Sequence, residues 1–350
     1  LGPGLIIEEI PIPKPGFREV LVAVEAASIC GTDLHIMHWD DWSSQRIKPP
    51  ITVGHEFAGT VIETDKAVEN IRVGDYVSAE SHVTCGNCAD CKSGNAHICP
   101  STSILGVDRD GAFADYLVLP DKVIWHNDRK QLPPVIATLQ ESFGNAVMAT
   151  LSNELKDRAI GVMGCGPLGL YSIAIAKAAG ALRILATDLS DYRLDLAKKM
   201  GADDTLNIAR TDIDPAHWMI EANGGIGVDV TMEMSGAVSA IDTALKTTRN
   251  GGRVTLIGIP PRPVEIDLAK RLIFKNLTVV GLNGRRIFDT WHQARDLLVS
   301  KQVDLKPLVS HEMELKDIHV AMEILEAGEA AKIVLRPKLG VETAQSFLPA

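Results

Sequence analysis

The pattern of hydrophobic and polar residues divides the chain into two regions of different texture. In the first 150 residues, strand-like hydrophobic runs are separated by polar stretches rich in glycine and proline. We predict strands there at Val20–Ala26, Gly59–Glu63 and Ala112–Leu119. The pattern therefore indicates a region that is mainly β.

From about Arg158 onward, strand-like runs alternate with helical patterns. Helices are predicted at Leu168–Ala179 and Asp191–Met200, and a further one at Trp291–Val299. The predicted strands are mainly hydrophobic: Ala159–Met163, Arg183–Thr187, Val228–Met232, Gly252–Ile257 and Leu277–Val280. This alternation favours an α/β unit with a parallel sheet that helices cover on both faces. Residues Leu339–Ala350 are predicted to form a weakly ordered tail.

Length and charge restrict the class of protein. A chain of 350 residues indicates two domains. The net charge of −10, without a run of basic residues, argues against nucleic acid or an anionic membrane as a partner. Ile160–Ala176 is uncharged over seventeen residues, but glycines and a proline interrupt it and it is too short for a membrane span. No signal peptide is visible, so we expect a cytoplasmic protein.

The stretch "GCGPLG" at Gly164–Gly169 fits the pattern G-x-G-x-x-G, directly after a predicted strand and at the start of a helix. Such glycines let a pyrophosphate approach the N–H groups of a helix N-terminus. Asp188 ends the next strand, where a carboxylate accepts hydrogen bonds from an adenosine 2′-OH and repels a 2′-phosphate. Arg193 is either an adenine contact or a solvated charge. We therefore predict an NAD site formed by Gly164, Gly166, Pro167, Leu168, Gly169 and Asp188.

Four of the six cysteines lie within fifteen residues, in the pattern C-x₂-C-x₂-C-x₇-C. Four thiolates can enclose Zn²⁺ in a tetrahedron with no open position, so such a site is structural. An iron–sulfur cluster is the alternative, because a ferredoxin run also ends in Cys-Pro, but it has three residues before its last cysteine. A disulfide is disfavoured in the cytoplasm. We predict a structural zinc site at Cys85, Cys88, Cys91 and Cys99.

A second set of candidate metal ligands is dispersed along the chain. Cys30 lies in "CGTDLHI", His55 and Glu56 lie in "GHEF", and Glu141 lies in "QESFGNAV". A thiolate, an imidazole and a carboxylate form a catalytic zinc site when one position stays open. Spacing alone leaves the alternative that Cys30 and His55 are ordinary buried residues. Asp33 is assigned a structural role.

The order of these motifs, Cys-Gly-Thr-Asp, Gly-His-Glu, the four-cysteine loop and then the nucleotide glycines, resembles the zinc-dependent medium-chain alcohol dehydrogenases. The resemblance covers nearly the whole chain. It implies a GroES-like, β-rich catalytic domain formed by residues 1–150 and 287–350, and a Rossmann NAD-binding domain at 151–286. It also implies a homotetramer.

The resemblance further implies that Cys30, His55 and a carboxylate hold a catalytic zinc, which gives two zinc ions per subunit. Glu56 and Glu141 are both candidates for the carboxylate. Zinc at such a site is a Lewis acid toward a secondary alcohol, and NAD⁺ accepts the hydride. The released proton needs a path to water. Thr32 and His35, together with the nicotinamide ribose, are expected to provide it, because histidine titrates near neutrality.

Several local motifs are similar to those of family members that oxidise L-threonine. They are "CGTDLHIMHWDDWS" at Cys30–Ser43, "AESHVTCGNC" at Ala79–Cys88, "FGNAV" at Phe143–Val147, "DYRLDLAKKMGA" at Asp191–Ala202 and "FDTW" at Phe288–Trp291. The similarity implies zinc-dependent oxidation of the L-threonine 3-hydroxyl by hydride transfer to NAD⁺, giving 2-amino-3-oxobutanoate. It also implies that His82 orients or polarises the substrate; the alternative is an ordinary loop histidine.

Two positions depart from those members. Ser142 stands where they commonly have proline, and Asn283 stands where an aromatic residue is expected. An NAD-dependent zinc dehydrogenase of a polyol, of 2,3-butanediol or of a sugar is therefore the alternative function. Arg285 and Arg286 are candidate partners for the carboxylate of L-threonine, with nucleotide phosphate contact or a solvated surface as the alternatives.

Overall fold

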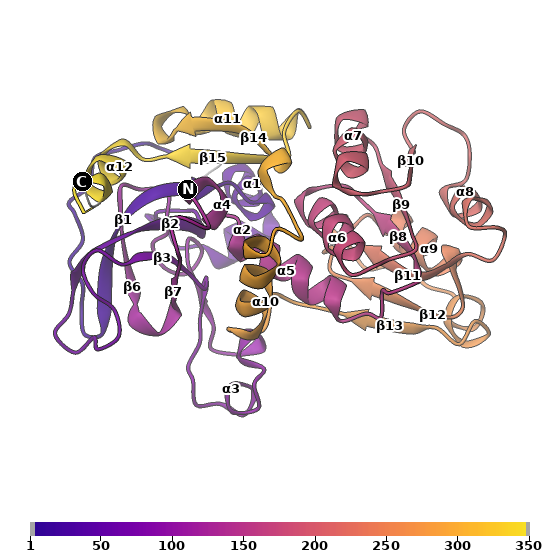
Figure 1. Cartoon of the computed structure of the whole chain (residues 1–350), viewed down its shortest axis with the longest axis horizontal. Helices are drawn as coiled ribbons and strands as arrows, with labels where there is room; N and C mark the ends of the chain where they lie inside the picture. The colour runs from indigo at the N-terminus through magenta and orange to yellow at the C-terminus, as the bar shows by residue number, and fades with distance from the viewer. Residues whose placement is uncertain (1–3, 348–350) are drawn as a thin grey trace. The chain divides into compact units, whose positions relative to one another are not determined.

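The computed structural model describes residues 4–347, and the chain forms two compact units. Unit 1 comprises the residues up to Ser142, Arg286–Arg295 and the residues from Val309 onward. Unit 2 comprises Phe143–Arg285 and Asp296–Leu308. Figure 1 shows that unit 1 takes segments from both ends of the chain. We predicted domains at residues 1–150 with 287–350 and at residues 151–286. These domain bounds stay a prediction.

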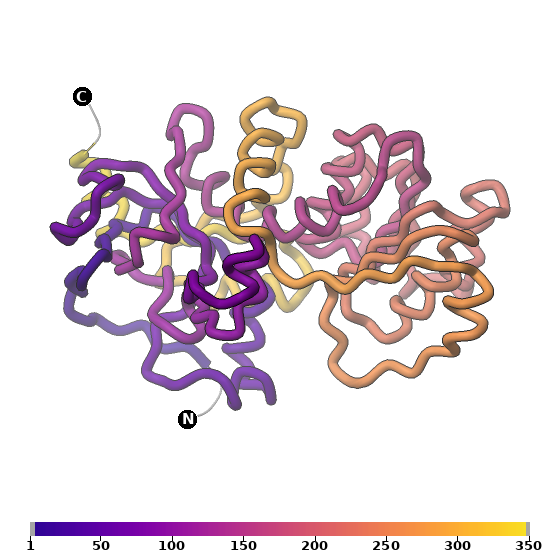
Figure 2. The backbone as a smooth tube through the Cα atoms, turned by 90° about the horizontal axis from the view of Figure 1, so that it is seen from below, coloured from indigo at the N-terminus to yellow at the C-terminus, as the bar shows by residue number. Residues whose placement is uncertain are grey.

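Unit 1 is built on a seven-stranded sheet in the order β14-β15-β1-β2-β3-β7, with β6 also paired to β1 (Figure 1). Its strands are β1 (Glu19–Ser28), β2 (Glu56–Thr64), β3 (Tyr76–Ala79), β6 (Tyr116–Pro120), β7 (Ile124–His126), β14 (Val309–Glu314) and β15 (Lys332–Arg336). A separate pair consists of β4 (His82–Val83) and β5 (Ser103–Ile104). The C-terminal β15 pairs with the N-terminal β1, and Figure 2 shows the yellow end of the chain among indigo and purple segments.

Strand β1 contains the predicted strand Val20–Ala26 and extends it at both ends. It pairs with β2 along its length, with β6 over its first half and with β15 at its end, and nine of its ten residues are buried. A strand with partners on both edges and covered faces needs small or hydrophobic side chains. The buried exception, Glu25, forms an ion pair with Arg129 at 2.6 Å and accepts a hydrogen bond from Thr60 at 2.8 Å.

The predicted strand Ala112–Leu119 is wrong in its first half, because only Tyr116–Pro120 is a strand. The N–H groups of Ala112 and Phe113 donate instead to the carbonyls of Gly54 and Val53, at 2.8 and 2.9 Å. Ala112 and Phe113 are buried and hydrophobic, but they lie in a loop that packs against the loop containing Val53 and Gly54. Hydrophobic pattern alone does not distinguish that arrangement from a strand.

The helices of unit 1 are short and lie between or beside the strands. They are α1 (Gly31–His38), α2 (Asp41–Arg46), α3 (Ala89–Lys92), α4 (Pro134–Ala137), α11 (Ile318–Glu326) and α12 (Lys338–Gln345), with the single turns η1 (Ala96–Ile98), η2 (Asp121–Val123) and η5 (Leu315–Asp317). Two helices contain a boundary between the units, α5 (Gln140–Leu151) and α10 (Asp289–Val299). The first 150 residues therefore contain more helix than the sequence pattern predicted.

Helix α12 overturns the prediction of a weakly ordered tail for most of its length. Gly340 donates its N–H to Asp115 at 3.0 Å, and the hydroxyls of Thr343 and Tyr116 are 2.8 Å apart. Ala344 is completely buried. These contacts hold α12 against the rest of unit 1. The last three residues of the predicted tail lie outside the described residues.

Unit 2 contains a six-stranded, entirely parallel sheet in the order β10-β9-β8-β11-β12-β13. Its strands are β8 (Ala159–Met163), β9 (Arg183–Asp188), β10 (Asp204–Asn207), β11 (Val228–Glu233), β12 (Thr248–Leu256) and β13 (Thr278–Gly281). Numbered within the unit, this order is 3-2-1-4-5-6, which is the order of the Rossmann fold. The prediction of a Rossmann sheet is confirmed. Ligands of such sheets bind where the strand order reverses, between β8 and β11.

The long helices of unit 2 alternate with these strands. They are α6 (Pro167–Ala178), α7 (Asp191–Met200), α8 (Pro215–Ala222) and α9 (Val238–Thr247), with the short turns η3 (Ala269–Ile273) and η4 (Lys306–Leu308). Helix α7 matches its prediction in both bounds, because Ser190 caps its start and Gly201 ends it in the left-handed conformation. Over residues 4–347, no helix combines the length and hydrophobicity that crossing a membrane requires.

Candidate metal centres and nucleotide site

The four-cysteine loop brings its sulfur atoms together around one point. The Sγ atoms of Cys85 and Cys91 are 3.9 Å apart, those of Cys88 and Cys99 are 3.8 Å apart, and those of Cys99 and Cys85 are 3.5 Å apart. Zn–S bonds of about 2.3 Å in a tetrahedron place sulfur atoms roughly 3.8 Å from one another. The four side chains therefore fit a closed zinc site, as predicted from their spacing.

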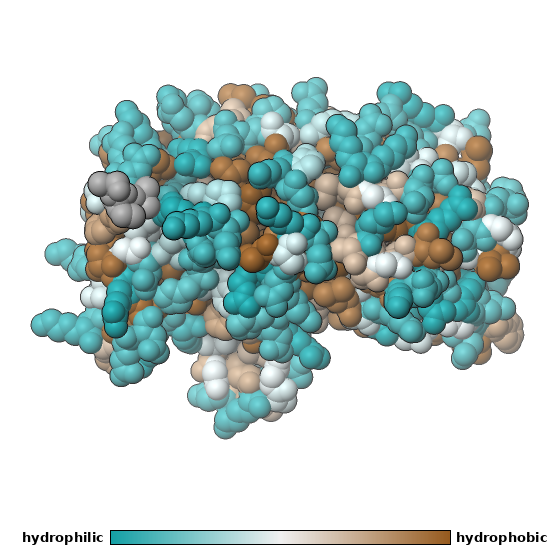
Figure 3. Space-filling view, viewed as in Figure 1, coloured by the Kyte–Doolittle hydropathy of each residue, from teal (hydrophilic) through white to brown (hydrophobic). Residues whose placement is uncertain are grey.

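Backbone N–H groups prepare these thiols to bind a cation. The N–H of Cys88 points to the sulfur of Cys85, and the N–H of Cys91 points to the sulfur of Cys88, both at 3.4 Å. Hydrogen bonds from Asn87 and Cys88 lower the pKa of the Cys85 thiol to about 6. The loop, which contains α3, projects at the lower edge of Figure 1, and its surface is mainly hydrophilic to neutral in Figure 3. A fully ligated metal in this loop has a structural role.

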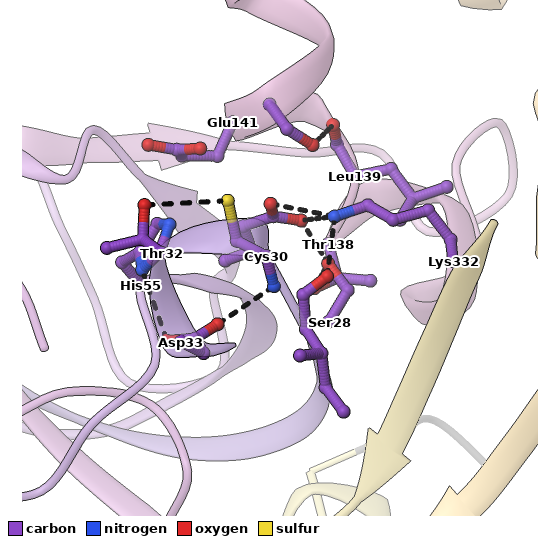
Figure 4. Close-up of polar contacts among 12 residues, drawn as sticks. Ser28, Cys30, Thr32, Asp33, His55, Thr138, Leu139, Glu141 and Lys332 are labelled. Atoms are coloured by element: carbon purple, nitrogen blue, oxygen red, sulfur yellow. Dashed lines mark hydrogen bonds and ion pairs between the residues drawn. The ribbon is translucent and has the colours of Figure 1, made fainter. Parts of the chain in front are cut away.

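A second group of ligand atoms lies in the core of unit 1. One ligand atom from each of Cys30, His55 and Glu56 lies within 4.8 Å of the others. Cys30 caps the N-terminus of α1, His55 immediately precedes β2, and Glu56 is the first residue of β2. Figure 4 shows Glu141, from α5, on the side toward which the Cys30 thiol points. The structure thus brings Cys30, His55 and Glu56 together from separate segments of unit 1, and Glu141 is not among the described ligand atoms that lie within 4.8 Å of one another.

Asp33 gives His55 an electrostatic partner. Its Oδ1 lies 3.7 Å from His55 Nδ1, and its Oδ2 accepts the N–H of Cys30 at 2.8 Å. Burial by itself lowers the pKa of His55, but Asp33, Cys30 and Glu141 together raise it well above the ordinary value. The negative charge that favours a proton on His55 also favours a metal ion at the same place. Metal binding therefore replaces that proton. Sequence reasoning gave Asp33 only a structural role and missed this contact.

Glu56 has a buried counter-charge that sequence reasoning missed. Lys332 Nζ lies 2.6 Å from Glu56 Oε2 and 2.8 Å from Oε1, and it donates to the carbonyl of Ile29 at 3.0 Å. Ser28 also donates its hydroxyl to Glu56. The available signal was a lone lysine within the hydrophobic run Ala330–Leu335, because a buried ammonium requires a carboxylate or carbonyl partner. Its partner was not predictable from spacing.

Glu141 has a different environment. Its Oε1 accepts a hydrogen bond from the hydroxyl of Ser81 at 2.6 Å, and the side chain is 5% exposed. Ser142, which replaces the expected proline, donates its hydroxyl to the carbonyl of Leu139 at 3.3 Å. Ser142 therefore binds to the backbone of its own turn, while Ser81 holds one oxygen of the Glu141 carboxylate.

The predicted catalytic residues occupy different positions. Thr32 Oγ1 lies 3.9 Å from Cys30 Sγ, beside the candidate zinc site. The His35 side chain is 65% exposed, with Nδ1 2.6 Å from Asp40 Oδ2. The His82 ring is largely buried, with Nδ1 2.9 Å from Glu80 Oε1.

The glycine motif of unit 2 has the conformation that a nucleotide requires. Gly164 has φ of +89°, which disfavours any residue with a Cβ, and a Cβ on Gly169 would collide with the carbonyl of Gly164. In contrast, a Cβ on Gly166 would meet nothing within 4 Å. Gly166 and Pro167 begin α6. The turn therefore leaves open space beside the helix N-terminus, which favours an anionic group.

Asp188 lies at the C-terminal end of β9, beside this turn. Its Oδ2 accepts the N–H of Cys165 at 2.7 Å, and its Oδ1 accepts the N–H of Ser190 at 2.9 Å. A carboxylate oxygen has two lone pairs, so these bonds leave capacity for a ribose hydroxyl. The buried Nε of Arg193 has no hydrogen-bond partner within the part of the chain described. Asp188 is bonded to the turn at Cys165, and the charge of Arg193 acts on the thiol of the same residue.

The two arginines considered as carboxylate partners differ sharply. Arg285 is 1% exposed and donates to Asn145 Oδ1 at 3.0 Å within unit 2. Arg286 is exposed and belongs to unit 1. Arg285 is thus engaged in the interior of unit 2, which makes Arg286 the better placed of the two for a ligand.

Comparison with known proteins assigns the chain to a family. The alcohol dehydrogenase GroES-like domain matches residues 16–129, and the zinc-binding dehydrogenase model matches residues 167–300. The chain belongs to the zinc-binding dehydrogenases. It is 48% identical to an L-threonine 3-dehydrogenase of Symbiobacterium thermophilum over 97% of this chain and 96% of the relative. It is 43% identical to the L-threonine 3-dehydrogenase of Bacillus subtilis over 95% of both chains.

A solved structure supports the same fold. The 2R,3R-butanediol dehydrogenase of Bacillus subtilis has a TM-score of 0.85 and 29% identity to this chain, and the match covers 95% of this chain and 96% of that structure. The predicted combination of a GroES-like region and a Rossmann region is therefore confirmed. The higher identity to L-threonine 3-dehydrogenases agrees with the local motifs identified in the sequence.

Proposed function

We propose that the protein is a zinc-containing, NAD-dependent L-threonine 3-dehydrogenase. The reaction is L-threonine plus NAD⁺ giving 2-amino-3-oxobutanoate, NADH and a proton. The observation that carries the proposal is 43–48% identity to L-threonine 3-dehydrogenases over nearly the full chain. The clustering of Cys30, His55 and Glu56 supports it, because a non-catalytic relative has no need of this ligand set.

The proposal assigns a task to each group of the candidate site. Bound zinc supplies Lewis acidity to the substrate hydroxyl, and bound NAD⁺ supplies the hydride acceptor. Cys30 and His55 hold the metal, and the carboxylate of Asp33, 3.7 Å from His55 Nδ1, places negative charge beside the imidazole. The carboxylate of Glu56 or that of Glu141 completes the ligand set: Glu56 lies within the cluster of ligand atoms, and Glu141 lies on the side toward which the Cys30 thiol points.

The same proposal gives the released proton a route. The Thr32 hydroxyl lies beside the Cys30 thiol and would pass the proton from the substrate to the nicotinamide ribose of bound NAD⁺. His35 lies three residues further along α1, and its exposed ring delivers the proton to solvent. The His82 ring, held at Nδ1, contacts the substrate. The nucleotide groups are those predicted, with Asp188 on the adenosine ribose.

Three finer statements accompany the main proposal. Each subunit binds two zinc ions, one at the four-cysteine loop and one at the Cys30 site, which metal analysis would count. The protein is a homotetramer; the exposed hydrophobic side chains of Ile259, Ile273 and Phe274 in unit 2 support association, and light scattering would give the mass. It is cytoplasmic, which the free thiols of the described cysteines support.

The first experiment is an assay of NADH formation by the zinc-loaded protein. L-threonine, D-threonine, 2,3-butanediol, sorbitol and glucose are offered in parallel, each with NAD⁺ and with NADP⁺. We expect kcat/KM to be highest for L-threonine with NAD⁺. A preference for a diol or a sugar would replace the substrate while leaving the zinc and nucleotide sites in place. Cys30→Ser should abolish turnover with every substrate, and the Cys91→Ser variant, if stable, should not.

A further inference from the structure

The "FDTW" motif at Phe288–Trp291 contains a buried hydrogen bond that the proposed reaction does not use. The Trp291 side chain is 1% exposed, and its Nε1–H donates to Glu80 Oε2 at 2.8 Å. Glu80 is completely buried. Both residues belong to unit 1, although 211 positions separate them in the chain. The motif thus reaches a carboxylate two residues before His82.

The other oxygen of Glu80 faces His82. Glu80 Oε1 accepts the backbone N–H of His82 at 2.9 Å and lies 2.9 Å from the ring nitrogen Nδ1. An ionised carboxylate only accepts hydrogen bonds, so the proton of a neutral imidazole belongs on Nδ1. The remaining nitrogen, Nε2, then carries a lone pair and accepts hydrogen bonds. One carboxylate therefore sets both the direction and the tautomer of the ring.

We propose that Glu80 and Trp291 are positioning residues that fix His82 as its Nδ1–H tautomer, so that Nε2 accepts a hydrogen bond from a donor group of the substrate. The proposal rests on the proposed function only in taking an alcohol bound near His82 as the substrate. Trp291 acts through Glu80, since its indole N–H occupies Oε2 and leaves Oε1 for the histidine. Neither residue touches the reacting atoms.

Trp125 provides a matched control within the same aromatic cluster. Its ring centroid lies 5.6 Å from that of Trp291 and 5.8 Å from that of Phe288. Trp125 is also buried, but its Nε1 has no hydrogen-bond partner among residues 4–347. Trp125→Phe and Trp291→Phe therefore remove the same ring atoms from one cluster. Only the second removes a hydrogen bond to Glu80.

Glu80→Gln tests the tautomer directly. The amide has one accepting and one donating end, while donors face it from both Trp291 and His82. In either orientation a donor faces a donor, and one orientation forces Nδ1 of His82 to become an acceptor. Adding Trp291→Phe removes the indole N–H that faces the second end of the amide, which favours the orientation with the amide oxygen toward His82. The double variant should then be more active than Glu80→Gln alone.

The experiment measures kcat and KM for the substrate that the wild-type holoenzyme oxidises best, so it can be read whichever alcohol that is. We expect Glu80→Gln to lower kcat/KM by about 10- to 100-fold and Trp291→Phe to restore at least fivefold of that loss. In a His82→Ala background, Glu80→Gln should change kcat/KM by less than about twofold. NADH binding and zinc content show whether each variant is folded.

A purely structural role gives different results. Losses that add in the double variant, a Glu80→Gln enzyme with wild-type activity, or an equal loss in the His82→Ala background would each overturn the proposal. If Glu80→Gln does not fold, the comparison of Trp291→Phe with Trp125→Phe tests the proposal instead. Trp291→Phe should then lower kcat/KM more than Trp125→Phe, and His82→Ala should abolish that difference; equal effects of the two substitutions would contradict the proposal.

Discussion

Lys332 Nζ lies 2.6 Å from Glu56 Oε2 in the interior of unit 1, with both side chains at most 1% exposed. The pair joins the first residue of β15 to the first residue of β2, 276 positions apart. Lys332 also binds the carbonyl of Ile29, directly before the candidate ligand Cys30. A buried ion pair is retained when further hydrogen bonds compensate the lost hydration. Here the bonds of Lys332 supply that compensation, and they fix the candidate metal ligand Glu56 to strand β15.

Lys332→Met should destabilise the protein strongly, because Glu56 would keep a buried charge without its counter-ion. Breaking one partner of such a pair costs about 3–5 kcal/mol. Thermal unfolding of wild type, Lys332→Met and Lys332→Met/Glu56→Gln at equal zinc content measures this. We expect the double variant to recover most of the loss, since the neutral amide no longer needs a cation. Equal instability of the single and double variants would show that packing, not charge, is responsible.

The sequence was most informative where the signal is local. Strand β8 and helix α7 match their predicted bounds, because a short hydrophobic run marks a buried parallel strand and Ser190 and Gly201 mark the ends of a helix. The four-cysteine site is local in the same sense, since its ligands lie within fifteen residues. In each case the deciding interactions join residues that are close in the chain.

The sequence was least informative where the partner is distant. Nothing near Lys332 identifies Glu56, and nothing near Glu80 identifies Trp291, since each pairing depends on the completed fold of unit 1. Helix α12 was missed for the same reason: its burial depends on contacts with Tyr116 and β1, while half of its own residues are polar. Tertiary contacts override weak local propensity in such segments.

Asp188→Asn should relax the choice between NAD⁺ and NADP⁺. The variant removes the negative charge that repels a 2′-phosphate but retains the size of the side chain. We expect the ratio of kcat/KM for NAD⁺ over NADP⁺ to fall at least about tenfold, which corresponds to about 1.4 kcal/mol. Asp191→Asn is the control, because that carboxylate lies nearby but binds Asn207 and Arg210. An unchanged ratio in Asp188→Asn would remove the ribose assignment.

Cys91→Ser should remove one zinc ion per subunit and lower stability. A closed Cys₄ site holds its loop through the metal, so losing a ligand costs a few kcal/mol, or about 5–10 °C in the temperature of half-inactivation. Metal analysis and residual activity after heating measure both effects. Cys165→Ser, which alters a buried thiol in unit 2, should leave the zinc content unchanged. A Cys91→Ser protein of normal stability that is inactive would contradict a structural role for the loop.

Gly340→Ala tests whether α12 is an integral part of unit 1. A Cβ at this position would collide with the carbonyl oxygen of Val24 in β1 and would lie 2.7 Å from the carbonyl oxygen of Asp115. Both are backbone atoms of paired segments, so neither can move without cost, and overpacking of this kind costs about 1–3 kcal/mol. Gly281→Ala is the control, since a Cβ there meets nothing within 4 Å. Thermal unfolding followed by circular dichroism should show a lower midpoint for Gly340→Ala only. Equal midpoints for both variants and the wild type would mean that α12 detaches from β1 in solution at no measurable cost, and that the tail is weakly ordered after all.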